Sequence, residues 1–191
     1  LTYTPNESMI SNTSVNNLLS LKYKIQSLAW VHSVITLLDI PLLDNSEAPL
    51  QERLENFKTL KDDDVDKDRG FKEIISSPVF RNFVISEDGK TSGIIVYLKK
   101  NIVNKKIENE IELEIYKDQI KKKRHQNILE IREVIKKHNQ NTQIYLGGIP
   151  MIADDMMTFI KNDIVTFGLA VLGFIILTLS RISSTLHKYL S

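Results

Sequence analysis

Between Ile164 and Ser180 the chain reads IVTFGLAVLGFIILTLS, a run of 17 residues without a charged side chain. A helix needs about 20 predominantly apolar residues to cross a bilayer, with a lower limit of about 17. A surface helix of a soluble domain would carry a polar face, and this run has none. A signal peptide would lie at the N-terminus. We therefore expect one membrane-spanning helix; the alternative is a fully buried helix in a larger assembly.

The charges on either side of this run differ in sign. Three acids and one lysine lie between residues 154 and 163, whereas Arg181, His187 and Lys188 follow the run without an acid. Positive residues favour the cytoplasmic side of a membrane. The sequence therefore predicts a cytoplasmic C-terminus and an extracytoplasmic location for residues 1–163.

The preceding part of the chain alternates between strand-like and helix-like patterns. The first predicted elements are a strand over 1–5, a helix after the candidate N-caps Asn12–Ser14, a buried strand over 30–38, a short helix around 50–60 and a helix over 71–76. Asp88-Gly89 between two apolar runs predicts a hairpin of 80–86 with 91–99. A helical composition over 105–138 follows, as one long helix or as two with a break near 121–126, and then a strand over 142–146.

This order of elements is that of an α+β domain, close to the ferredoxin-like split βαβ arrangement with additions. We expect a domain over 1–149, a helix over 150–181 that runs into and across the membrane, and a short tail over 182–191. The Gly147-Gly148 pair predicts the turn before that helix, with Pro150 at its first helical position. Asp154 and Asp155 would complement the helix dipole. Asp163 would lie at the membrane edge, as an interfacial anchor or on an ion path.

Composition excludes several classes of function. The 191 residues carry a net charge of +1 and no cysteine. The charge argues against a nucleic-acid binder, and the lack of cysteine excludes disulfide scaffolds, thiolate metal sites and cysteine nucleophiles. No nucleophile elbow, phosphate-binding loop or dinucleotide fingerprint is present. We therefore expect no enzyme, no catalytic residues and no cofactor.

One acidic segment resembles a calcium-binding loop. Asp62, Asp64, Asp66 and Glu73 fall at ligand positions of a twelve-residue EF-hand loop. Lys67, however, occupies the sixth position, where the sharp turn needs glycine. We therefore expect a solvated acidic loop and no metal site.

Four segments together resemble one family of membrane transporters. The stretch LGGIPMIADDMMTFIKNDIVTFGLAVLGFIILTLS (146–180) resembles the junction between porter domain and membrane in exporters of the resistance-nodulation-division (RND) superfamily, in its MMPL-like branch. LTYTPNE (1–7) is similar to the end of the first porter strand, and WVHSVITLLDIPLL (30–43) to the strand and turn after the first porter helix. SSPVFRNFVISEDGKTSGIIVYLK (76–99) resembles the hairpin that follows.

The resemblance implies a fragment of a proton-driven exporter of lipids or other hydrophobic compounds in the bacterial inner membrane. The chain would be the first periplasmic porter loop plus the second membrane helix. Its partners would be the remaining transmembrane helices, the second porter domain, the bilayer and a hydrophobic substrate, with no nucleic acid. The family's proton-relay acids lie in later helices, so none is assigned here. Coupling would pass through Gly147, Gly148, Pro150, Asp154 and Asp155.

A second interpretation stays open at this stage. With one predicted span and no ionisable pair inside it, the chain could be a membrane-anchored interaction or scaffolding domain without transport activity.

Overall fold

The computed structural model describes residues 1–43, 49, 51–52, 56–100 and 109–190. The chain divides into two compact units, Leu1–Gly148 and Ile149–Ser191. The first is a mixed α/β domain with two small antiparallel sheets, and the second consists of one long helix, α5 (Ile149–Leu190). The α+β prediction is thus confirmed at the level of fold class.

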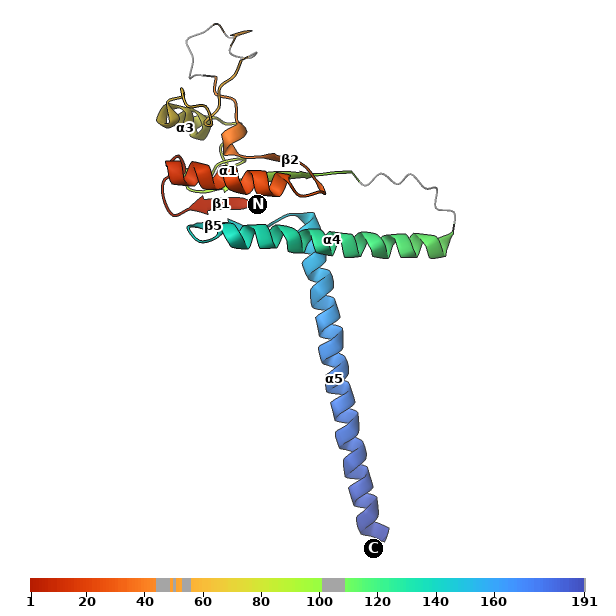
Figure 1. Cartoon of the computed structure of the whole chain (residues 1–191). Helices are drawn as coiled ribbons and strands as arrows, with labels where there is room; N and C mark the ends of the chain where they lie inside the picture. The colour runs from red at the N-terminus through yellow and green to blue at the C-terminus, as the bar shows by residue number, and fades with distance from the viewer. Residues whose placement is uncertain (44–48, 50, 53–55, 101–108, 191) are drawn as a thin grey trace. The chain divides into compact units, whose positions relative to one another are not determined.

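The first sheet is built around the first strand of the chain. Strand β1 (Thr2–Pro5) lies between β3 (Ser92–Gly93) and β5 (Thr142–Tyr145), and it is antiparallel to both (Figure 1). Thr2 pairs with Tyr145 and Pro5 with Thr142. The predicted strands over 1–5 and 142–146 are therefore confirmed, and they are neighbours.

The second sheet contains β2 (Val31–Ile35) and β4 (Ile95–Leu98), also antiparallel. A single residue, Ile94, separates β3 from β4. Its N–H donates to the carbonyl oxygen of Leu1 at 2.8 Å, and the Leu1 amino group donates to the carbonyl oxygen of Ile94 at 2.8 Å. The backbone contact with the first residues of the chain thus continues past the end of β3.

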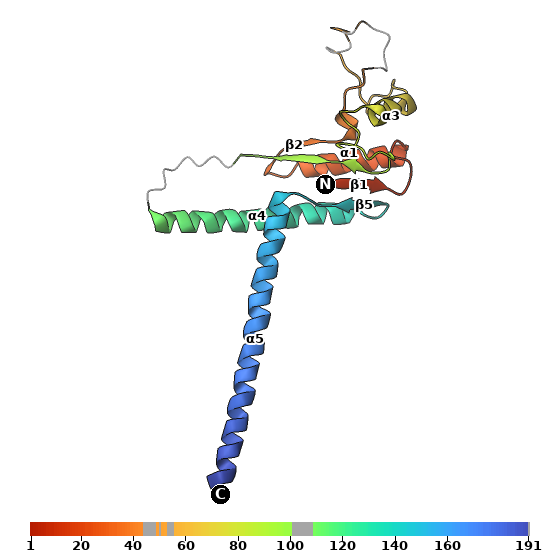
Figure 2. The ribbon, with the colours of Figure 1, turned by 180° about the vertical axis from the view of Figure 1, so that it is seen from behind.

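Two helices run alongside the strands in both views (Figures 1 and 2). They are α1 (Asn12–Gln26) and α4 (Glu110–His138), which lie side by side. Each presents an apolar stripe to the core; the buried members are Val15, Leu18, Leu21 and Ile25 in α1 and Ile128, Ile131 and Ile135 in α4. Burial of these side chains, each contributing about 1.5–3 kcal/mol, fixes both helices on the domain.

The predicted hairpin forms only at its closed end. Asp88-Gly89 makes a tight turn, with Gly89 at φ +69° and its N–H donating to the carbonyl oxygen of Ser86 at 2.9 Å. Beside it, Ile85 forms an antiparallel bridge with Ser92, and the N–H of Gly93 donates to the carbonyl oxygen of Val84 at 2.7 Å. The rest of the first arm is not a strand, because three successive N–H groups from Phe83 to Ile85 donate to the carbonyl oxygen of Phe80. The second arm divides into β3 and β4.

Other boundaries also differ from the predictions. The side chain that caps α1 is Ser11, one residue before the predicted caps. The strand predicted over 30–38 ends at Ile35 and gives way to a 3₁₀ turn, Leu37–Asp39. The predicted helix over 71–76 is α3 (Lys67–Ser76), which begins four residues earlier because Asp66 caps it.

The structure also tests the helices predicted over 105–138 and around 50–60. Helix α4 is continuous through 121–126, so the alternative of two helices is wrong. The helix expected around 50–60 lies partly outside the described residues; within them, Gln51 and Glu52 are helical, whereas Lys58 forms a bridge with Leu42, so the end of that segment is not helical.

Candidate functional site

Helix α5 is long and apolar enough to cross a membrane. Its candidate span is Ile149–Ile182, with a mean hydropathy of 2.1 over its most apolar window, and no residue of that window is buried. Large side chains such as Phe167 and Leu177 expose 73% and 69% of their surface. Exposure of this kind along an apolar stretch of helix is typical of a segment that needs an apolar surrounding. The helix is consistent with membrane association.

The interior of the apolar run holds small and hydroxylated residues. A Cβ atom at Gly168 or Gly173 would meet nothing within 4 Å. The hydroxyl of Thr178 donates to the carbonyl oxygens of Phe174 (2.8 Å) and Ile175 (2.9 Å). Thr178 therefore satisfies its polar group within its own helix, as a threonine in an apolar surrounding must.

The predicted coupling residues are distributed over both units of the chain. Gly147 and Gly148 are the last residues of the first unit, whereas Pro150 is the second residue of α5 rather than the first. Gly148 has φ +121°, a conformation that only glycine adopts without strain. Gly147 has open space where a Cβ would lie. The two glycines are therefore not equivalent: only Gly148 is required by its backbone.

The acids of α5 lie within the candidate span but before its uncharged run. Asp154 and Asp155 are half-buried and both take part in polar interactions, while Asp163 is exposed. The carbonyl oxygen of Asp154 also accepts a hydrogen bond from the hydroxyl of Thr158 at 3.0 Å. Arg181 follows the uncharged run and is likewise engaged in a polar interaction.

The acids of the segment that resembles a calcium-binding loop each have a separate structural role. Asp62 accepts hydrogen bonds from the N–H and hydroxyl of Thr59 at 2.7 and 3.0 Å. Asp66 caps α3, and Glu73 accepts from the N–H of Leu43 at 2.6 Å. Asp64 pairs with Lys58, and this hydrogen bond lowers the pKa of Asp64. Among the described residues, no group of three or more His, Asp or Glu side chains could hold a metal ion.

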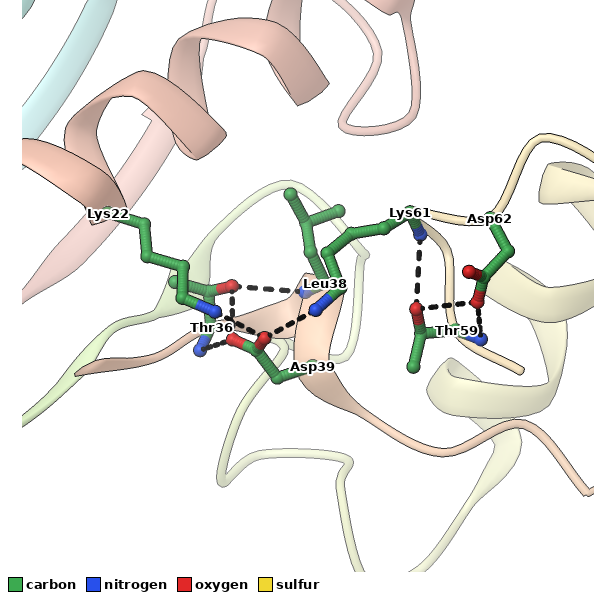
Figure 3. A network of polar contacts seen from close by, with 7 residues as sticks. All are labelled: Lys22, Thr36, Leu38, Asp39, Thr59, Lys61 and Asp62. Carbon is green, nitrogen blue, oxygen red and sulfur yellow. Dashed lines mark hydrogen bonds and ion pairs between the residues drawn. The ribbon is translucent and has the colours of Figure 1, made fainter. Parts of the chain in front are cut away.

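A polar network centred on Asp39 was not predicted from the sequence (Figure 3). The Asp39 carboxylate pairs with Lys22 of α1 and with Lys61 (2.9 Å), and it accepts from the N–H and hydroxyl of Thr36 at 2.8 and 2.9 Å. Burial alone would raise the pKa of Asp39, but the hydrogen bonds from Lys22, Lys61 and Thr36 outweigh it and lower the pKa to about 2. The carboxylate therefore joins three segments of the domain.

The same short sequence motif, a threonine followed three residues later by an aspartate, occurs twice in this network. Thr36-Leu37-Leu38-Asp39 and Thr59-Leu60-Lys61-Asp62 each place an aspartate three residues after a threonine, and in each the aspartate accepts from the threonine's N–H and hydroxyl. Figure 3 shows the two turns joined through Lys61 and Asp39. The spacing is that of a capping box with aspartate in place of glutamate, a signal already present in the sequence.

Comparison with protein-family models, with curated proteins and with solved structures finds no match to this chain. The functional argument therefore rests on its own residues, on the mixed α/β domain and on the exposed apolar helix that follows it.

Proposed function

We propose that the chain is the first porter segment of a proton-driven, MMPL-like exporter of the RND superfamily that moves lipids or other hydrophobic compounds. Residues 1–149 are the periplasmic porter domain in this proposal, and α5 is the second membrane helix. The observation that carries the proposal is the direct succession of a β-α-β-rich domain and an apolar helix with exposed side chains.

The strand arrangement supports a ferredoxin-like domain. If β3 and β4 are taken as one strand interrupted at Ile94, the order becomes β5, β1, β3 with β4, and β2, with all neighbours antiparallel. Strands β1 and β2, which helix α1 connects, then have another strand between them. That insertion is what defines a split βαβ unit.

The charges around the apolar run support the orientation. Acids dominate the segment from Asp154 to Asp163, and basic residues follow from Arg181 onward. With positive residues on the cytoplasmic side, the α/β domain lies outside the cytoplasm. In the exporter, movement of this domain is transmitted to α5 through the short connection from Gly147 to Pro150, followed by Asp154 and Asp155.

Cysteine labelling tests the orientation directly, because the chain has no cysteine of its own. Asn16→Cys places a thiol on the exposed side of α1, and Ser184→Cys places one after the apolar run. In intact cells a membrane-impermeant maleimide should label Asn16→Cys, and Ser184→Cys only after permeabilisation. The unsubstituted chain is the blank. The reverse pattern of labelling would refute the proposed topology.

A membrane-anchored scaffolding domain is the second candidate. The observation in its favour is that the described residues contain one candidate span, whose central run from Ile164 to Ser180 has no ionisable side chain. The coding sequence on both sides of this segment separates the two functions. A reading frame that continues into further apolar helices supports the exporter, and an independent start and stop support the anchor.

A further inference from the structure

One side of the first sheet is turned away from the core. In β1, Tyr3 is buried, and successive side chains of a strand point to opposite faces of its sheet. Thr2 and Thr4 therefore lie on the outer side, and their partners in β5 are Tyr145 and Gln143. All four outer side chains are at least partly exposed, and Tyr145 exposes 64% of its surface.

The second sheet has an outer side of the same kind. In β2, Ser33 and Ile35 flank the buried Val34, and they pair with Tyr97 and Ile95 of β4. Ile35 exposes 38% and Tyr97 48% of its surface. These residues are therefore accessible on the side of the strands that lies away from the core.

The two outer sides adjoin each other. Leu1 and Ile94 exchange two backbone hydrogen bonds of 2.8 Å at the point where β3 passes into β4. The start of β1 therefore stays beside the chain up to the second sheet. We call the combined surface the outer sheet face; it consists of the eight outer residues of β1, β5, β2 and β4.

The outer sheet face carries no charged side chain. Charged residues make up 26% of the chain, so eight average positions would include about two. Charges return directly beyond the strands, with Lys90 before β3 and Lys99 after β4, and both are exposed. An uncharged centre that contains tyrosines and has a polar rim is the composition of a protein interface.

The polar groups of this face match a second copy of the same face. A hydroxyl group both donates and accepts hydrogen bonds, and so does an amide such as that of Gln143. Because the face has no charge, two copies meet without repulsion, and no complementary set of charges is needed. The residues that carry a hydroxyl are Thr2, Thr4, Ser33, Tyr97 and Tyr145.

We propose that the outer sheet face is an interface between two copies of this chain, packed face to face about a two-fold axis. A two-fold interface uses the same patch on both copies, which is what a self-matching surface provides. Eight residues are fewer than the about 20–30 on each side of a standard interface, so the dimer is weak and reversible. This inference does not depend on the proposed transport function.

Sedimentation equilibrium of the full chain, in a detergent matched to the density of the solvent, tests the proposal. The chain should show a reversible equilibrium between monomer and dimer. Tyr97→Asp introduces a charge on both sides of the two-fold interface and should raise the dissociation constant at least about tenfold. Asn16→Asp introduces the same charge on the exposed side of α1 and should leave the constant unchanged.

A second variant covers the case in which Tyr97→Asp does not fold. Tyr145→Asp changes a more exposed position on the other sheet, and the fluorescence of Trp30 reports whether each variant is folded. Dimers of the folded variant that are as tight as those of Asn16→Asp would mean that the chain associates through another surface, such as α5, and would overturn the proposal. A chain that stays monomeric at all concentrations would overturn it as well.

Discussion

Asp39 connects α1, the turn after β2 and the segment around Lys61 through one carboxylate. Removing the Asp39 carboxylate would leave both Lys22 and Lys61 without this ion-pair partner, because the two lysines share the same acid. Asp64, in contrast, forms its ion pair with Lys58 at the surface, where 66% of its side chain is exposed. Exposed pairs contribute little to stability, because water and salt screen the attraction between the charges.

The first prediction concerns these two aspartates. Asp39→Asn should lower the free energy of unfolding by about 1–2 kcal/mol at pH 7, after allowance for solvent screening, and Asp64→Asn should leave it nearly unchanged. The measurement is urea unfolding of the full chain followed by the fluorescence of Trp30, the single tryptophan. Equal effects of the two substitutions would contradict this role of Asp39.

The lowered pKa of Asp39 also predicts a pH dependence. The folded-state pKa of about 2 lies below the unfolded value of about 3.9, so the stabilisation is complete above about pH 4. It should decline as the pH falls from about 4 toward 2. The difference in stability between the parent chain and Asp39→Asn should therefore shrink over that range, and a constant difference would argue against it.

The two glycines at the end of the first unit allow a matched comparison. Gly148→Ala should destabilise the domain by about 1–3 kcal/mol, because alanine is strained at φ +121°. Gly147→Ala should leave stability nearly unchanged, since its Cβ meets no atom within 4 Å. If Gly147→Ala nevertheless reduces transport in the full-length exporter that we propose, this residue acts in coupling and not in folding; unimpaired transport would make the pair a structural turn.

At the level of elements, helix α4 has two unlike halves. Ile131 is 3% exposed in the core, whereas Ile115 is 55% exposed in the half that begins at Glu110. Composition predicted a helix over 105–138, yet only the C-terminal part of α4 is covered by the domain. A helical composition shows that a helix forms, but only the tertiary structure shows how much of its apolar face is buried.

Ile131→Ala and Ile115→Ala should therefore differ strongly. We expect the first to cost about 2–5 kcal/mol of unfolding free energy, because it opens a cavity in the core. The second should stay within about 0.5 kcal/mol, as is usual for surface positions. The same urea titration measures both, and comparable losses would mean that the first half of α4 is covered in solution.

The sequence predicted those elements whose pattern is long or bounded by clear signals. Helix α1 and strands β1 and β5 were found from their apolar pattern, α4 from its helical composition and α5 from its uncharged run. The first arm of the hairpin pairs only at its end, near Ile85, because the residues before it form local turns, with Asn82 at φ +61°. The Asp39 network brings together residues that are far apart in the chain, and periodicity does not detect such contacts.

For the whole molecule, the length of α5 is informative. Its 42 residues correspond to about 63 Å at 1.5 Å per residue, and the uncharged run to about 25 Å. A bilayer has a hydrocarbon core of about 30 Å. In a membrane, about half of the helix would therefore lie outside the hydrocarbon core. The charged residues at both ends of the helix would lie in these outer parts.

A charge in the middle of the run tests the span. Val171→Arg should reduce the fraction of chain that resists alkaline extraction from membranes severalfold, because arginine there costs about 2.5–3.5 kcal/mol of insertion free energy. Asn162→Arg, before the uncharged run, should have little effect. Resistance to extraction that persists in Val171→Arg would indicate that α5 is held by protein contacts instead.

The central position of β1 has a consequence for biosynthesis. Strand β1 is made before both of its partners, and one of them, β5, is made only after most of the domain. Its edge therefore stays open during translation, and an unpaired edge invites wrong pairing. Since α5 follows almost at once, completion of the sheet and synthesis of the apolar helix coincide. We expect nascent chains that end before Thr142 to need chaperone protection.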